Sequence, residues 1–368
     1  MSVTVANTTA NLSGAELLKK DGTHTITGTM TFDRDPSAPF VVTSGSAVVT
    51  NLDADKVDGY EAAALAVLAE DETVSGRWIF STIPSDLLNG ICEGRLTLTT
   101  ATPVTTTDVT GATTMYFTPY KGNRIALFDG TNWKVYAFTE LSLALGTLTT
   151  LTPYDVFCYD NSGTPTLEFL AWTNDTTRAT ALTTQDGVLS KTGALTRRYL
   201  GTFRTTATTT TEDSFAKRFV WNYYNRVSRP MRVVEATDTW TYSTATVRQA
   251  NASAANQLAF VVGVAEVEVE ATVQALCKND SGTGVIQAVG IGEDVTNAFT
   301  SGHMGGYRES AVVNIYLPLV GSLRKFVAVG YHFWAWCEYS GASATTTWLG
   351  DGGTPTITQS GISGSLFG

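Results

Sequence analysis

Apolar and polar residues alternate along much of the second half of the chain, with the period of two that is typical of β-strands. The clearest example is the segment 264–273, where one face would carry carboxylates and the other small apolar side chains: Glu266, Glu268 and Glu270 against Ala265, Val267, Val269 and Ala271. Residues 323–339 are apolar on both faces after Phe326, which indicates a strand buried on both sides. The pattern predicts an all-β fold made of antiparallel strands.

Two pairs of apolar segments flank turn-forming residues and predict β-hairpins. In the first hairpin the strands are residues 125–128 and 133–138, with the turn at Asp129-Gly130. In the second they are residues 154–159 and 166–172, with the turn beginning at Asp160. Further strands are expected at residues 96–100, 197–203, 213–226, 285–291, 311–317 and 345–349.

The composition supports a strand-rich protein of more than one domain. Charged residues are only 16% of the 368 residues, against about a quarter in typical proteins. A chain of this length can form two or three domains with sizeable cores. We expect a docking or flexible N-terminus, a shaft-like segment, a connector and two β-sandwich domains, the last of them jelly-roll-like: residues 1–22, 23–81, 82–95, 96–228 and 229–368.

The N-terminal region contains an internal repeat. The segment Thr73-Val-Ser-Gly-Arg-Trp-Ile-Phe80 repeats the pattern of Thr25-Ile-Thr-Gly-Thr-Met-Thr-Phe32, with Asn51-Leu-Asp-Ala-Asp-Lys-Val-Asp-Gly-Tyr60 between the two copies. Asp58 and Glu61 have the spacing of a capping box, so a short helix is expected over residues 61–69. A helix of this length needs packing against other segments or subunits.

The two copies and the Asp-Gly segment between them resemble the shaft repeat of tailed-bacteriophage tail fibres, over roughly residues 23–81. The resemblance implies a homotrimer whose shaft winds around a threefold axis, and an N-terminus that attaches to other virion proteins. The side chains expected to face that axis are Ile26, Phe32, Leu52, Val57, Tyr60, Leu65, Leu68, Val74, Trp78 and Phe80. The alternative is a repeated surface hairpin in a monomer.

The order of strands in the last third of the chain resembles the trimeric jelly-roll heads of the tumour-necrosis-factor type. In such a head the loops at residues 279–284, 300–307 and 340–345 would face a host receptor. The candidate receptor-binding residues in these loops are Asn279, Asp280, His303, Met304, Tyr307, Ser340 and Ser343. For His303, a plain connecting loop is an equally open interpretation.

Charge and motifs weigh against several functional classes. The net charge of −10 and the pI near 4.8 argue against a nucleic-acid binder. Four arginines, at Arg218, Arg226, Arg229 and Arg232, lie among aromatic residues, and we expect a packed interface there rather than a platform for single-stranded nucleic acid. Residues 1–20 lack signal-peptide features, and no apolar run approaches the roughly 20 residues of a membrane span. We expect synthesis in the cytoplasm without membrane insertion.

No catalytic, metal or cofactor site is expected. The three histidines, His24, His303 and His332, are far apart in the sequence, and His332 is expected to be a satisfied, partly buried residue. The glutamate face at residues 266–270 is expected to be solvated, with a calcium cluster as the alternative. The four cysteines have neither zinc-site nor disulfide-framework spacing. There is no Gly-x-Ser-x-Gly elbow, Walker loop or dinucleotide fingerprint.

The resemblance to tail fibres therefore implies a structural virion protein, a tail fibre that attaches to a host glycan or protein through its C-terminal domain. Repetition of weak sites in a trimer would raise the avidity. Two alternatives remain open: a head-fibre, collar or baseplate adaptor without receptor binding, and a depolymerase that cleaves surface glycans.

Overall fold

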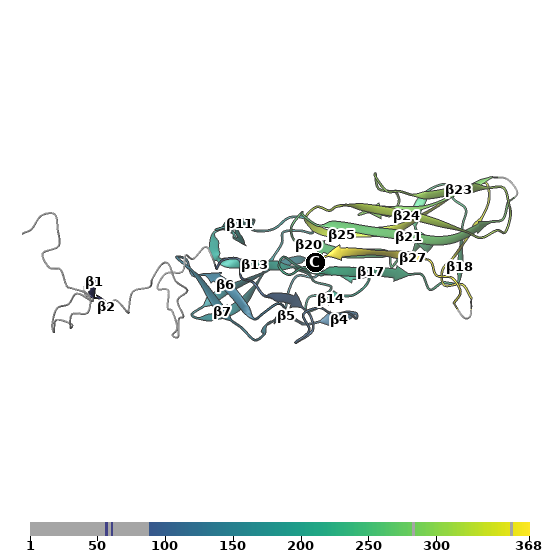
Figure 1. Ribbon diagram of the computed structural model, residues 1–368. Coiled ribbons are helices and arrows are strands. Elements are labelled where there is room, and N and C mark those ends of the chain that lie inside the picture. Colours follow the sequence, from purple (N-terminus) through teal and green to yellow (C-terminus); the bar gives the residue numbers. More distant parts are fainter. Residues whose placement is uncertain (1–55, 58–59, 62–87, 282–283, 354–355) are drawn as a thin grey trace, which may run out of the picture. The chain divides into compact units, whose positions relative to one another are not determined.

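The computed structural model describes residues 56–57, 60–61, 88–281, 284–353 and 356–368 (Figure 1). The chain divides into two compact units, Met1–Ile79 and Phe80–Gly368. In the first unit, β1 (Lys56–Val57) pairs with β2 (Tyr60–Glu61) in an antiparallel hairpin. Glu61, which we expected in the first turn of a helix, is therefore in a strand. The sequence between the two strands is Asp-Gly, a dipeptide that favours two-residue hairpin loops over a helix start.

The rest of the predicted shaft lies outside the described residues. This holds for the remainder of the expected helix, for both copies of the repeat, and for all expected axis residues except Val57 and Tyr60: Ile26, Phe32, Leu52, Leu65, Leu68, Val74, Trp78 and Phe80. The shaft and its threefold axis stay a prediction.

In the second unit, β-strands make up nearly all of the regular secondary structure of the described residues, as predicted, and these residues include no α-helix. The one helical element among them is a 3₁₀ turn, Ala250–Ala252. No helix in the described part of the chain is long and apolar enough to cross a membrane.

Residues 94–222 supply one larger sheet and two small ones. Sheet 1 has the order β10-β9-β13-β12-β11, with β16 also paired to β13. Its strands are β9 (Pro153–Asn161), β10 (Thr164–Ala171), β11 (Leu182–Gln185), β12 (Val188–Lys191), β13 (Ala194–Arg204) and β16 (Val220–Asn222). The small sheets are β3 (Gly94–Thr97), β5 (Thr114–Pro119) and β8 (Leu141–Ala144), and β6 (Arg124–Phe128) with β7 (Trp133–Ala137).

Two larger sheets form the remainder of the unit. Sheet 2 has the order β23-β22-β25-β20-β15-β14-β4, with β19 paired to β25. Its strands are β4 (Val109–Ala112), β14 (Thr211–Asp213), β15 (Lys217–Arg218), β19 (Val247–Gln249), β20 (Gln257–Val262), β22 (Val285–Glu293), β23 (Gly306–Ser310) and β25 (Gly330–Ser340). Because β4, β14 and β15 precede residue 228, sheet 2 contains strands from both sides of the expected domain boundary.

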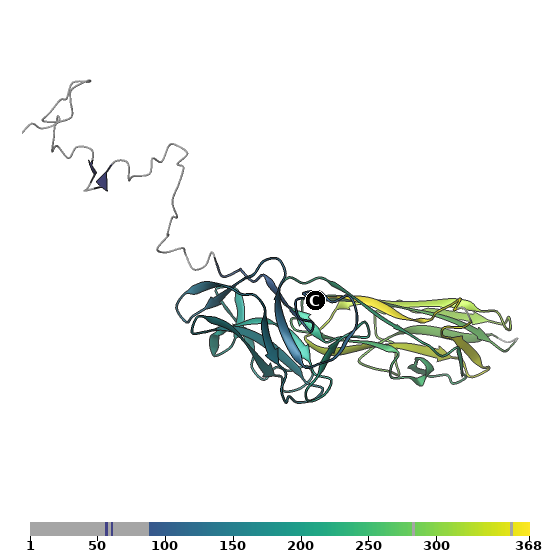
Figure 2. The same ribbon diagram turned by 90° about the horizontal axis from the view of Figure 1, so that it is seen from below.

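Sheet 3 has the order β17-β27-β21-β26-β18, with β24 paired along β21. Its strands are β17 (Ser228–Val234), β18 (Thr239–Tyr242), β21 (Glu268–Asn279), β24 (Leu317–Phe326), β26 (Thr346–Leu349) and β27 (Gly361–Phe367). Within the second unit, the blue and teal strands of residues 94–222 gather at one end and the long green and yellow strands at the other (Figure 2). All described pairings are antiparallel except β15 with β20.

One hydrophobic core joins sheets 2 and 3. It includes Trp334 and Trp336 of β25 on one side, and Trp240 of β18 and Trp348 of β26 on the other, with Val273 of β21 among them. The Trp240 ring lies 5.8 Å from the Trp336 ring and 6.5 Å from the Trp348 ring. Aromatic rings at these separations add attraction beyond their burial. A second hydrophobic core is formed by buried residues between Cys92 and Val220. It includes Phe117 of β5, Cys158 of β9 and Phe203 of β13.

The local predictions have mixed outcomes. Both hairpins are confirmed, as β6 with β7 and as β9 with β10. Residues 213–226 form three short strands rather than one. Residues 323–339 divide between β24 and β25, because Gly330 has a backbone φ of 139°, a conformation that favours glycine.

Residues 311–317 do not form the expected strand. Residues 311–316 are a turn between β23 and β24, and only Leu317 is in a strand. The large side chains of residues 311–317 are exposed: Val312, Val313, Ile315, Tyr316 and Leu317. An apolar run does not by itself distinguish a buried strand from an exposed apolar turn, because both have the same composition.

Candidate functional site

A groove of about 700 Å³ crosses the outer face of sheet 3, opposite the tryptophan core. Strand register aligns its floor in two adjacent rows that run across β17, β27, β21 and β24. Each row contains one outward-facing residue from each of these strands: Arg232, Ser363, Thr272 and Ser322 in the first, and Pro230, Ser365, Glu270 and Arg324 in the second. Because the period of a strand is two, the same strands send their alternate residues into the core.

Small polar side chains make up much of the floor. Serine and threonine occupy the middle of the groove, at Ser363, Ser365, Thr272 and Ser322. On one side the next outward position of β24 is Val320, and on the other it is Phe326. On β24, the small side chain of Ser322 therefore lies beside the larger side chain of Val320.

Three hydroxyl groups on the floor have no hydrogen-bond partner among the described residues: those of Thr272, Ser322 and Ser363. The fourth, on Ser365, donates to a carboxylate oxygen of Glu270 at 3.1 Å. A hydroxyl group can both donate and accept a hydrogen bond. The floor therefore offers polar atoms to a ligand, while its backbone groups are already paired within the sheet.

Larger side chains line the two ends of the groove. Phe215 lines the end near β17 and Met304 the end near β24. The backbone of Met304 pairs with Ser322, with N–H to O distances of 2.7 and 2.8 Å between donor and acceptor atoms. The Met304 side chain is 71% exposed. An exposed methionine is an adaptable apolar contact for a ligand.

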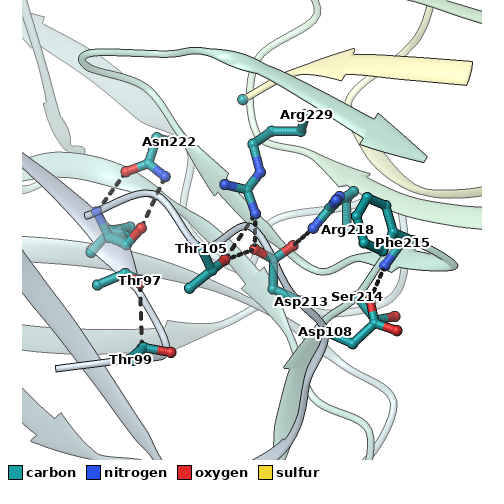
Figure 3. A network of polar contacts seen from close by, with 12 residues as sticks. Thr97, Thr99, Thr105, Asp108, Asp213, Ser214, Phe215, Arg218, Asn222 and Arg229 are labelled. Atoms are coloured by element: carbon teal, nitrogen blue, oxygen red, sulfur yellow. Dashed lines mark hydrogen bonds and ion pairs between the residues drawn. The ribbon is translucent and has the colours of Figure 1, made fainter. Parts of the chain in front are cut away.

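A buried ion-pair network holds Phe215 in place (Figure 3). Asp213 accepts hydrogen bonds from Arg229 at 2.6 Å and Arg218 at 3.3 Å, and the Arg218 guanidinium also donates to the backbone oxygen of Pro230. The Phe215 N–H donates to Asp108 at 2.7 Å. The network thus fixes the turn that carries Phe215 against strand β17.

Charge is distributed unequally along the groove. At the β24 end, Arg324 pairs with Glu268 at 2.6 Å, and Glu270 lies close to the same guanidinium. At the β17 end, the Arg232 guanidinium has no ion-pair partner in the part of the chain that the structure describes, and it lies 5.8 Å from the centre of the Phe215 ring. The β17 end therefore presents an available cation.

The seven predicted receptor-binding residues are divided by the structure. Met304 lines the groove, and Tyr307 on β23 is exposed. Asp280 and Ser343 are exposed as well. His303 is half-buried, with Nδ1 at 2.8 Å from the Thr300 carbonyl oxygen and its ring 4.9 Å from that of Phe299.

Two of the seven need correction, because their side chains are buried. Asn279 and Ser340 are both 0% exposed. The Ser340 hydroxyl shares a 2.6 Å hydrogen bond with that of Thr346, and the Asn279 amide donates to the backbone oxygen of Ser281. Each lies at the end of a long strand rather than in the loop that follows it, so neither side chain is available to a partner.

The three predicted loops do not form one surface. Asp280 and Thr345 are hydrogen-bonded in both directions, through the backbone and the Asp280 carboxylate, so the first and third loops are adjacent. The Asn314 N–H donates to the Asn279 carbonyl oxygen, which places the exposed apolar turn beside them. The second loop pairs instead with Ser322, midway along β24, and so belongs to the groove.

The structure also bears on three further predictions, which concern the arginine–aromatic segment, His332 and the glutamate face. The arginine–aromatic segment is packed in part, because Trp221, Arg218 and Arg229 are buried. Arg232 is exposed, which differs from the packed interface that we predicted. His332 is also buried and satisfied: although burial lowers its pKa, the hydrogen bond to Asp294 raises that pKa overall. The glutamate face is exposed at all three positions, with Arg226 and Arg324 as partners of Glu266 and Glu268.

Within the described ranges, no group of three or more His, Cys, Asp or Glu side chains is arranged to hold a metal ion. The four cysteines are buried free thiols. Burial raises the pKa of Cys92 to about 11 and that of Cys337 to about 12, so these thiols are unreactive near neutral pH.

One buried acid has an unusual environment. Glu338 of β25 is 0% exposed, accepts a 2.8 Å hydrogen bond from Trp240 Nε1 and pairs with Arg248 at 2.7 Å. Burial raises the pKa of Glu338 to about 7, although Arg248 acts in the opposite direction. It lies in the core between sheets 2 and 3, on the opposite side of sheet 3 from the groove.

Sequence reasoning missed most of the groove. Ser363 and Ser365 lie in a segment that resembles a glycine-rich tail, yet Gly361-Ile-Ser-Gly-Ser-Leu-Phe367 alternates Ile362 and Leu366 with the two serines. That alternation is the signal that could have identified β27. Which strands lie beside it is not encoded in any local pattern.

Comparison with known proteins gives no family: no protein-family model and no curated protein sequence matches the chain.

Proposed function

We propose that this protein is a structural component of a bacteriophage virion, a homotrimeric tail fibre that attaches to the host surface through its C-terminal region. The shaft-like repeat at residues 23–81 supports the fibre assignment. In this proposal sheets 2 and 3 form a jelly-roll-like β-sandwich, the N-terminal region joins other virion proteins, and the protein is made in the host cytoplasm. The common core of the two antiparallel sheets supports the sandwich.

The observation that carries the attachment role is the groove on sheet 3. Its floor presents three hydroxyl groups that have no hydrogen-bond partner within the described part of the chain, at Thr272, Ser322 and Ser363, between Phe215 and Met304 at its ends. A saccharide has hydroxyl groups that both donate and accept hydrogen bonds and apolar ring faces that pack on aromatic side chains. We therefore propose a surface glycan as the ligand.

The groove favours binding over cleavage of that glycan. Glycosidases generally need two carboxyl groups on either side of the bond that they break. Glu270 is the one carboxylate among the residues that line this groove. The depolymerase alternative therefore has less support than the binding role.

Filling the groove tests the binding role. The Ser363→Trp variant places a large side chain on the floor, so binding to host cells or to their purified surface glycans should be lost. Thr184→Trp is a matched control, because Thr184 is an exposed threonine on a strand of sheet 1. Equal binding by the wild-type protein and both variants would overturn the groove as the attachment site.

The solution mass of the full chain tests the fibre. Light scattering should give three times the chain mass of 39.3 kDa. Deleting residues 1–81 then separates two sources of association: loss of the trimer would assign it to the shaft, and its retention to the C-terminal region. A monomeric full-length chain would overturn the homotrimer. A trimer without any binding to host cells would favour the adaptor alternative.

A further inference from the structure

We propose that the ligand of the groove is an anionic saccharide, whose carboxylate or phosphate group binds Arg232 at the β17 end. This inference rests on the proposed glycan-binding role and adds the chemical class of the ligand. It comes from the charges along the groove rather than from its shape.

Arg232 is a cation without an ion-pair partner among the residues that the structure describes, and it lies beside Phe215. Its backbone N–H donates to the Phe215 carbonyl oxygen at 2.9 Å, and its guanidinium lies against the Phe215 ring. Its side chain is exposed and begins the row that continues through Ser363 and Thr272. A planar guanidinium can bind a carboxylate or phosphate through two parallel hydrogen bonds.

The groups behind Phe215 strengthen the positive potential at this end. Arg218 lies 5.1 Å from the Phe215 ring, and Arg229 and Arg95 lie deeper in the same network. Burial, and to a smaller extent the neighbouring Arg229, lowers the pKa of Arg95 to about 10. Asp213 accepts hydrogen bonds from Arg218 and Arg229 within the network, and the Asp108 carboxylate accepts the Phe215 N–H.

With Arg232 included, this end of the groove has four guanidinium groups and the two carboxylates of Asp213 and Asp108. Among the described residues nearby, Glu212 is paired with Lys217 at 3.1 Å. This local excess of positive charge occurs in a chain with a net charge of −10. Fields from buried charges are weakly screened, so they reach a ligand in the groove.

The opposite end of the groove has no such excess. Arg324 is neutralised by Glu268 at 2.6 Å, and Glu270 adds a further negative charge. An anionic ligand would therefore bind in one direction, with its charged group at Arg232 and its hydroxyl groups over Thr272 and Ser322. Neighbouring strands are about 4.8 Å apart, so the four strands offer a path of roughly 14 Å.

The test compares ligands of equal length with the full-length protein in calorimetry. The probes are oligogalacturonate for the carboxylate, oligomeric glycerol phosphate for the phosphate, and a neutral dextran oligosaccharide. We expect one anionic probe to bind at least tenfold more tightly than dextran, and its affinity to fall as NaCl rises from 0.05 to 0.5 M. The identity of that probe distinguishes the two sources of charge.

Substitutions connect the effect to Arg232. Arg232→Gln should remove the preference for the anionic probe and its salt dependence, whereas Arg232→Lys should retain both in part. Arg197→Gln is the matched control, because Arg197 is paired with Glu168 on sheet 1, outside the groove. Urea unfolding of each variant verifies that the fold is retained.

The outcomes separate this inference from the function on which it rests. If all probes bind equally, or if Arg232→Gln keeps the anionic preference, the anionic ligand is refuted and the glycan-binding role stands. If no saccharide binds and Ser363→Trp leaves attachment to host cells unchanged, both proposals fail.

Discussion

The two faces of sheet 3 are made by the same strands and have opposite characters. On the inner face, Val269 and Val273 of β21 are buried against the tryptophans of the common core. On the outer face, Glu270 and Thr272 of the same strand are exposed beside serines of β27. One alternating segment thus supplies both a stabilising core and a candidate binding surface.

The difference shows what constrains each face. Inner positions must fill the space against a second sheet at the density of a protein interior, so their volume is fixed. Outer positions face water, and small polar side chains occupy the middle of the groove. We therefore expect inner substitutions to change the stability of the protein, and outer substitutions to change its binding.

The largest change in the free energy of unfolding is expected for a substitution in the core. Trp336→Ala should lower the free energy of unfolding by about 3–5 kcal/mol, because it removes a fully buried ring that contacts Trp240 across the two sheets. Thr272→Ala on the outer face should change it by less than about 0.5 kcal/mol. Urea unfolding measures both values, and similar losses for the two variants would contradict the distinction between the faces.

The buried ion pairs of Asp213 are expected to affect both the stability of the protein and its ligand binding. Asp213→Ala leaves Arg218 and Arg229 buried without their carboxylate, so the free energy of unfolding should fall by about 3 kcal/mol. Ligand binding should weaken as well, because Phe215 loses the support of its turn. Glu268→Ala breaks an exposed ion pair with Arg324 and should cost far less stability. A stable Asp213→Ala protein with unchanged binding would refute the positioning role of the network.

The inner face should also respond to pH through Glu338. Its pKa is about 7 in the folded protein against 4.5 ordinarily, so the folded state binds the additional proton between these values. The contribution of Glu338 to stability therefore falls as pH rises from about 4.5 to 7, by an amount on the order of 3 kcal/mol, and is constant above that range.

The comparison with Glu338→Gln isolates this contribution from other titrating groups. The variant should gain stability relative to the wild-type protein as pH rises through the same window, measured by urea unfolding at a series of pH values. Parallel stability curves for the two proteins would show that Glu338 titrates normally.

The smallest effect on stability is expected at the β24 end of the groove. Met304→Ala removes an exposed side chain, so the free energy of unfolding should change by less than about 0.5 kcal/mol while glycan binding weakens a few-fold. Tyr307→Ala is the matched control, because Tyr307 is 69% exposed on the neighbouring strand but does not line the groove. Equal losses of binding would extend the site along β23.

The sequence predicted those elements whose partners are near in the chain. Both hairpins follow from turn residues between two apolar segments, and the alternation at residues 264–273 assigned Val267 and Val269 to the core. Prediction from the sequence failed at residues 311–317, where an apolar run is an exposed turn. It also failed at Asn279 and Ser340, which were expected in exposed loops and are buried at strand ends. Composition alone carries no information on which apolar or polar residues a neighbouring strand covers.

What the sequence by itself determined is the class of structure and the face of each strand, because side chains alternate along a strand whatever its neighbours are. The tertiary structure decided which strands became neighbours. Arg232, Ser363, Thr272 and Ser322 come from four separate segments, and only the register of sheet 3 places them in one row. Such pairings connect residues far apart in the chain, and they depend on the packing of both faces of the sheet at once rather than on any local pattern.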